Sequence, residues 1–225
     1  MSKVKEVSPT LESSAFEEAY FKELQEQNLD LKSKGTWQKM YVYYLDLIFK
    51  VKGKKILDLG CAFGSIPSAF ADYRSDVIGV DISKFATEKT PFKNIKLINT
   101  PAWDLSMIPD NSIDFVHSMY MFEYLPVDKR DQVFAEIKRI CKPDALVFVI
   151  LNMGIHKKGQ SPLIHLSQKF EWDEIAAKYG MLDGARTYYY KLMETRVPGW
   201  EFMAIYHWAF LCYKVIKKET ENVTV

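Results

Sequence analysis

The chain has little of several features that mark whole classes of protein. Only three cysteines occur among its 225 residues, and Cys61, Cys141 and Cys212 lie far apart, with no CxxC pair. No histidine stands at metal-ligand spacing either. The sequence therefore predicts no disulfide framework and no metal site, and it favours a reduced, cytoplasmic protein.

An excess of charge of either sign is also missing. Thirty lysines and arginines face 29 aspartates and glutamates, which leaves a formal net charge of +1. Nucleic-acid binding usually needs a basic surface that neutralises phosphates. We therefore expect no nucleic-acid partner.

Long apolar runs are absent as well. The longest ones, residues 145–151 and 202–213, fall short of the roughly 20 residues that span a bilayer. The opening "MSKVKEVSPTLESS" is polar and has no apolar segment of a signal peptide. We expect no membrane association, and a disordered lead-in over residues 1–14.

What the chain does have is enough apolar material for one sizeable α/β core, at 48% hydrophobic residues. Apolar residues at helical spacing over 16–28 and 37–49 predict two helices. Five short β-branched or aromatic runs follow and predict strands. These runs are "KKILDL" (54–59), "DVIGVD" (76–81), "NIKLIN" (94–99), "SIDFVHSM" (112–119) and "ALVFVIL" (145–151).

Helical patterns or polar connections separate these strands. The clearest helix is "DKRDQVFAEIKRICKPD", which Asp128 can cap and Pro143 can stop. "EWDEIAAKYG" predicts another helix, and residues 185–216 predict two long strands joined at Pro198-Gly199. The fold class predicted is α/β: a Rossmann-like, doubly wound, mostly parallel sheet with a C-terminal antiparallel hairpin and an N-terminal helical cap.

Ligands of such folds bind outside the carboxyl ends of the strands, where a small-residue turn follows the first strand here. A dinucleotide fingerprint, GxGxxG, is degraded to Gly60, Ala62 and Ser65. Asp58 precedes the turn, and its carboxylate would repel a pyrophosphate but favour an ammonium group. The turn therefore suits a cationic cofactor without phosphates.

Several motifs resemble the class I S-adenosylmethionine-dependent methyltransferases, in particular their small-molecule, methyltransferase-domain group. The resemblance covers residues 54–151 and implies S-adenosyl-L-methionine as cofactor and methyl transfer to an O or N of a small organic acceptor. The motifs, in order, are "LDLGCAFG", "VIGVDIS", "IPDNSIDFV", "FEYLP" and "FAEIKRICKPDALVFVI".

The resemblance also implies roles for single residues. The turn would surround the methionyl part of the cofactor, Asp81 would accept hydrogen bonds from both ribose hydroxyls, and the loop after the third strand would meet the adenine. In that loop Ala102 stands where the family commonly has an acid. The cofactor-binding residues predicted in this way are Asp58, Gly60, Ala62, Gly64, Asp81, Trp103, Asp104 and Ser118.

Methyl transfer is an in-line displacement, so a base is needed only when the acceptor must lose a proton. Candidate catalytic groups at the strand ends are Glu123, Tyr120 and His156. Trp37 and Tyr41, from the helices before the first strand, are the predicted acceptor-pocket residues.

One domain is expected over residues 15–217, as a monomer or homodimer. It divides into a helical cap (15–51), a cofactor-binding core (52–151) and an acceptor-side insertion with the last strands (152–217), followed by a tail (218–225). Two other functions remain open: an NAD-linked oxidoreductase, and a catalytically inactive Rossmann-like partner subunit. Asp58 and the broken GxGxxG disfavour the first, and the presence of both Asp58 and Asp81 argues against the second.

Overall fold

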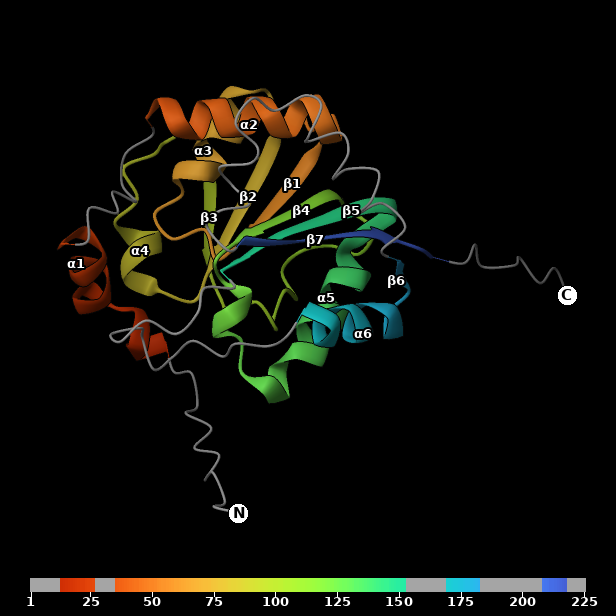
Figure 1. Cartoon of the computed structure of the whole chain (residues 1–225). Helices are drawn as coiled ribbons and strands as arrows, with labels where there is room; N and C mark the ends of the chain where they lie inside the picture. Colours follow the sequence, from red (N-terminus) through yellow and green to blue (C-terminus); the bar gives the residue numbers. More distant parts are fainter. Residues whose placement is uncertain (1–12, 27–34, 153–168, 183–207, 218–225) are drawn as a thin grey trace, which may run out of the picture.

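The computed structural model describes residues 13–26, 35–152, 169–182 and 208–217. These residues form a seven-stranded sheet with helices on both faces (Figure 1), in the strand order β3-β2-β1-β4-β5-β7-β6. The strands are β1 (Lys55–Leu59), β2 (Asp76–Asp81), β3 (Lys96–Asn99), β4 (Ile113–Met119), β5 (Cys141–Asn152), β6 (Met181–Leu182) and β7 (Trp208–Val215).

The first five strands run parallel, and β7 pairs antiparallel with both β5 and β6. The predicted fold class, a mostly parallel Rossmann-like sheet with an antiparallel C-terminal end, is confirmed. The first strand of the predicted hairpin lies outside the described residues, and the short strand β6 is one that the sequence pattern did not indicate. The strand order reverses between β1 and β4, which is where open sheets of this kind bind ligands.

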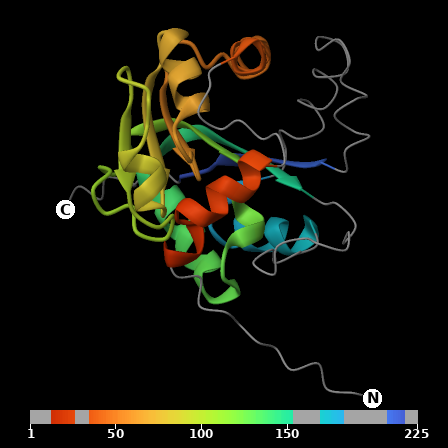
Figure 2. The same ribbon diagram turned by 90° about the vertical axis from the view of Figure 1, so that its left-hand side faces the viewer.

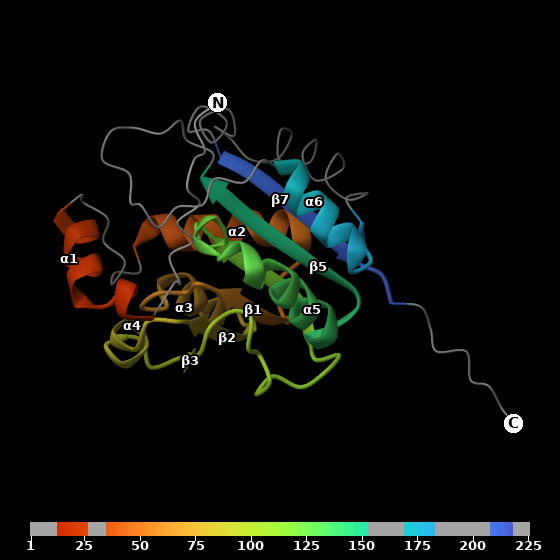
Figure 3. The same cartoon turned by 90° about the horizontal axis from the view of Figure 1, so that it is seen from below.

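Helices α2 and α3 cover one face of the sheet, and α5 and α6 cover the other (Figures 1 and 3). The α-helices are α1 (Glu18–Glu26), α2 (Thr36–Phe49), α3 (Ser65–Asp72), α4 (Lys84–Glu88), α5 (Arg130–Ile140) and α6 (Lys169–Lys178). Short 3-10 helices are η1 (Ser13–Phe16), η2 (Phe122–Tyr124) and η3 (Val127–Lys129). Two helices precede β1, as the periodicity predicts. No described helix is long and apolar enough to cross a membrane.

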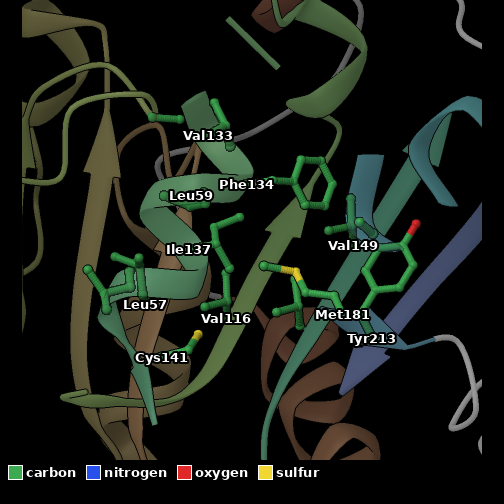
Figure 4. Close-up of a cluster of buried hydrophobic side chains, with 14 of the residues drawn as sticks. Leu57, Leu59, Val116, Val133, Phe134, Ile137, Cys141, Val149, Met181 and Tyr213 are labelled. Carbon is green, nitrogen blue, oxygen red and sulfur yellow. The ribbon is translucent and has the colours of Figure 1, made fainter. Parts of the chain in front are cut away.

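Alternation along β1 divides its side chains between two buried clusters. Leu57 and Leu59 join the cluster beneath α5 and α6, where Phe134, Ile137 and Tyr213 pack (Figure 4). Ile56 belongs to the opposite cluster, beneath α2 and α3. Because both faces are covered, the strand reads as an almost continuous apolar run. Asp58 is the polar exception, and the same alternation directs it to the α2 and α3 face.

The expected ends of α5 are wrong. The helix begins at Arg130, and Asp128 lies in the preceding η3 instead of capping it. It ends at Ile140, so that Pro143 falls inside β5. The backbone N–H of Ser112 donates to the Ile140 carbonyl at 2.7 Å, so the loop before β4 satisfies the end of the helix.

Asp114 connects the three central strands. Its carboxylate accepts the backbone N–H of Lys55 on β1 at 2.9 Å and the ammonium of Lys142 on β5 at 2.7 Å. Burial opposes the charge, but these hydrogen bonds hold the pKa of Asp114 below its usual value. Asp114 therefore belongs to the framework of the sheet.

Candidate cofactor and acceptor site

The turn between β1 and α3 is built from residues in the left-handed conformation. Gly60, Ala62 and Gly64 have φ values of 75°, 48° and 86°. Glycine adopts such values without steric cost, whereas an alanine there is strained. The backbone N–H groups of Gly60 and Cys61 both donate to the Val80 carbonyl on β2, at 2.8 and 3.1 Å. The turn is thereby fixed to the neighbouring strand.

Both glycines of the turn, Gly60 and Gly64, also lack space for a side chain. A Cβ on Gly60 would lie 2.4 Å from the Met121 Cβ, and one on Gly64 would lie 2.4 Å from the Ile95 Cδ1. Conformation and close approach therefore both require glycine at these two positions.

The turn yields a stability prediction with a matched control. Gly60→Ala should lower the free energy of unfolding by about 2–4 kcal/mol, through the left-handed strain plus the overlap with Met121. Gly53 has a φ of 77° but nothing within 4 Å of its added Cβ, so Gly53→Ala should cost only about 1 kcal/mol. Urea denaturation of both variants measures the difference, and equal losses would contradict the role given to Met121.

Asp81, at the end of β2, links this turn to the next loop. One carboxylate oxygen accepts the backbone N–H of Ala62 and the other accepts that of Ser83, both at 2.8 Å. Burial raises the pKa of Asp81 to about 6, and the nearby charge of Asp58 adds to the effect, although the two backbone hydrogen bonds oppose it. At neutral pH Asp81 is thus ionised, and its burial makes that charge unfavourable for the stability of the fold.

Asp58, at the end of β1, is buried and contacts a residue of β4. Its carboxylate lies 2.5 Å from Nδ1 of His117, whose Nε2 lies 2.7 Å from the Tyr41 hydroxyl on α2. His117 is completely buried. Neither this histidine nor its contacts were predicted from the sequence. The available signal was a histidine in the middle of a strand, between Val116 and Ser118.

Polar groups gather where β4 ends. Ser118 is buried and donates its hydroxyl to the Leu59 carbonyl at 2.9 Å. Tyr120 has a left-handed φ of 57°, which is rare for a bulky residue and often marks a functional site. Glu123, in η2, is also buried. The sequence-predicted residues Ser118, Tyr120 and Glu123 therefore share one strand end.

The charge of this carboxylate acts on three tyrosines, all of which keep their protons at neutral pH. Burial raises the pKa of Tyr20, Tyr120 and Tyr124, and the charge of Glu123 contributes to each shift. Tyr20 and Tyr124 place their hydroxyl oxygens 3.4 Å apart. At neutral pH these side chains can donate hydrogen bonds, but they are poor bases.

The loop after β3 carries the two residues predicted to meet adenine. Trp103 is partly buried and packs against the cluster beneath α5. Asp104 is exposed, and its hydrogen bonds with Ser106 hold the pKa of its carboxyl below the usual value. The hydroxyl of Thr100 donates to the Asp104 carbonyl at 2.9 Å. Trp103 and Asp104 stay predictions as cofactor contacts.

The segment η1–α1 lies across the strand ends, as Figure 2 shows from that side. The ring of Phe21 lies 4.8 Å from that of Phe63 in the turn and 6.1 Å from that of Phe85 in α4. Phe16 packs edge-on against Tyr124 at 5.6 Å. The first helix thereby contacts the segments that follow β1, β2 and β4. Its apolar spacing predicted a helix, but not these contacts.

The predicted acceptor residues Trp37 and Tyr41 lie one turn apart on α2. Their rings stack, with centroids 5.3 Å apart and an interplanar angle of 2°. Trp37 is 48% exposed, whereas Tyr41 is buried. His156 and most of the predicted acceptor-side insertion lie outside the described residues. Within the described segments, no cluster of three His, Cys, Asp or Glu side chains could hold a metal ion.

A sheet of this order, with a glycine turn after β1 and a carboxylate ending β2, defines a Rossmann-like cofactor-binding core. Residues 57–149 match the family model described as a methyltransferase domain. The match covers less than half of the 225 residues, and over this stretch the resemblance to methyltransferases found in the sequence is confirmed.

Known proteins with similar sequences are methyltransferases of differing specificity. The 24-methylenesterol C-methyltransferase 2 of Arabidopsis thaliana is 32% identical over 45% of this chain and 30% of its own length. The ubiquinone biosynthesis O-methyltransferase of Acinetobacter baylyi is 27% identical over 43% of this chain and 42% of its own. The matched region thus spans less than half of either protein, and neither name supports the oxidoreductase alternative.

Solved structures agree on the fold. Phosphoethanolamine N-methyltransferase 2 of Haemonchus contortus, crystallised in complex with S-adenosyl-L-methionine, superposes with a TM-score of 0.53. It is 18% identical, and the superposition covers 79% of this chain and 53% of that one.

Proposed function

We propose that the protein transfers a methyl group from S-adenosyl-L-methionine to an oxygen or nitrogen of a small organic acceptor. The observation that carries the proposal is the joint geometry of Asp81 and the Gly60–Gly64 turn, within a region that matches the methyltransferase family model. The cofactor would supply an electrophilic methyl group, and the chain's own residues bind, orient and shield the reactants.

The residues present fit such a cofactor. An ionised carboxylate has about four acceptor sites, and Asp81 uses one on each oxygen for a backbone N–H. Acceptor capacity remains on both oxygens for the two ribose hydroxyls. The turn would hold the methionyl part, Asp58 its ammonium group, and Trp103 with Asp104 the adenine, while Ser118 supports the turn through Leu59.

Binding measurements test this proposal directly. Calorimetry should show micromolar binding of S-adenosylmethionine and S-adenosylhomocysteine, and negligible binding of NAD. Asp81→Ala should weaken the cofactor affinity by about 1–3 kcal/mol, because a buried acceptor of ligand hydrogen bonds is lost. Asp114→Ala is the control and should lower the melting temperature more than the affinity. Tight NAD binding without a response to S-adenosylhomocysteine would refute the proposal.

The same measurements should depend on pH. Because the pKa of folded Asp81 is about 6, above its ordinary value of 3.8, the ionised form costs folding stability above pH 6, and this cost fades as the pH falls toward 4. Cofactor binding needs the ionised form, so the dissociation constant should rise below pH 6, by up to about tenfold per unit. The affinity of Asp81→Asn should be weak and flat over this range.

The residues at the end of β4 also include a candidate base for acceptors that must lose a proton. The raised pKa of Tyr120 keeps its hydroxyl protonated, which makes it a hydrogen-bond donor. Among the described candidates, Glu123 carries a carboxylate, a side chain that can serve as a general base. We assign it this role toward an O–H or N–H acceptor, with Tyr20, Tyr120 and Tyr124 orienting the reactants.

A screen of small hydroxyl and amine compounds with a radiolabelled methyl donor tests this assignment. Once an acceptor is found, Glu123→Gln should lower kcat by about 100-fold or more, and the affinity for S-adenosylmethionine should change little. Glu88→Gln, on the exposed face of α4, is the matched control and should keep full activity. A Glu123→Gln enzyme with full activity would refute the assignment of Glu123 as the base. If no compound in the screen is methylated although the cofactor binds, the alternative of a catalytically inactive partner subunit would be favoured.

The contacts of α1 support a further part of the proposal, that this helix shields the site from water. Phe21→Ala removes the ring that packs on the turn at Phe63. It should lower kcat more than it lowers the melting temperature, because methyl transfer benefits from an enclosed site. Hydrogen exchange over residues 15–26 should slow when S-adenosylhomocysteine binds. An exchange rate that does not change when the ligand binds would show that α1 only packs on the sheet and does not close over the site.

A further inference from the structure

Three polar side chains from three separate elements, Asp58, His117 and Tyr41, form one hydrogen-bonded network inside the protein. Asp58 and His117 are direct neighbours in the register of the parallel strands β1 and β4, so their side chains stand on the same face of the sheet. Nδ1 of His117 lies 2.5 Å from the Asp58 carboxylate. Its Nε2 lies 2.7 Å from the hydroxyl of Tyr41, which reaches down from α2.

These three side chains are buried, and aromatic rings pack on the histidine. The imidazole of His117 has no exposed surface, and Asp58 and Tyr41 are buried as well. The rings of Phe70 and Phe148 lie with centroids 5.6 and 6.4 Å from that of His117. In such a place each hydrogen bond is electrostatically stronger than in water, and an unpaired polar atom would be costly.

The tautomer of His117 decides the direction of these hydrogen bonds. With the proton on Nδ1, the imidazole donates to the Asp58 carboxylate, and Nε2 accepts from the Tyr41 hydroxyl. Each group therefore fixes the orientation of the next, from α2 through β4 to the end of β1.

We propose that His117 and Tyr41 are positioning residues, which hold the Asp58 carboxylate in place for the ammonium group of the cofactor. The inference rests on the proposed function, because Asp58 precedes the turn that would bind the methionyl part. One oxygen of Asp58 is held by His117, which orients the carboxylate at the point where β1 leads into Gly60. A consequence is that α2, which also carries Trp37, is linked to the cofactor site.

A purely structural role would have a different signature. If the three groups only stabilise the core, removing the Tyr41 hydroxyl would lower the melting temperature and leave the affinity for the cofactor alone. If they position Asp58, the same change would weaken the affinity, and the weakening would require the charge of Asp58. A double-mutant cycle separates the two cases.

The experiment measures S-adenosylhomocysteine binding by calorimetry for the full chain and three variants: Tyr41→Phe, Asp58→Asn and the double variant. Tyr41→Phe should weaken binding about 3- to 10-fold, the range for one hydrogen bond. In the Asp58→Asn background the same change should have less than about a twofold effect. Tyr44→Phe, one turn along α2, is the matched control and should bind like the wild type.

Equal effects of Tyr41→Phe in both backgrounds, or no effect in either, would overturn the positioning role. A wild-type protein that fails to bind S-adenosylhomocysteine would instead refute the proposed function, so the two failures are distinguishable. Should Tyr41→Phe not fold, NMR of the wild type provides a second readout. The His117 Nδ1–H resonance should lie far downfield, exchange slowly with water and shift when S-adenosylhomocysteine binds. A resonance that does not respond to the ligand would overturn the inference.

Discussion

The site depends on one short-range constraint, the pair of hydrogen bonds that the Asp81 carboxylate accepts from Ala62 and Ser83. Through them the turn after β1 and the loop after β2 are held to the same group. The left-handed conformation of Ala62 is strained, and the hydrogen bond from its N–H helps to keep the residue there. A carboxylate that organises the backbone in this way can also present its remaining acceptor sites to a ligand.

Most of the fold could be predicted because the strands are short apolar runs with both faces buried. That pattern located β1 to β5 and the antiparallel β7, and strand alternation with helices implied the parallel sheet. Local signals misled where a distant group decided the outcome. Asp128 resembles a cap and Pro143 a stop, but η3 and the Ser112 N–H determine where α5 begins and ends.

The positions of the candidate site residues in the fold were predictable to the same extent. Asp58, Gly60 and Asp81 follow from the rule that ligands bind at the carboxyl ends of parallel strands. The partners of these residues did not follow from it, because they depend on register and packing. His117 reaches Asp58 only through the pairing of β1 with β4, and Phe21 reaches Phe63 only through the path of the chain before α2.

The charges at the strand ends differ between the candidate cofactor site and the candidate acceptor site. Asp58 and Asp81 lie at the ends of adjacent strands, and the charge of Asp58 adds to the cost of ionising Asp81, which a cationic cofactor with two hydroxyl donors would relieve. The charge of Glu123, by contrast, acts on three protonated tyrosines, which come from α1 (Tyr20), from η2 (Tyr124) and from the residue after β4 (Tyr120). In the proposed function, cofactor recognition resides in the strand ends of the Rossmann-like core. Acceptor choice would then reside in the elements outside it, with α1 and α2 as the described part.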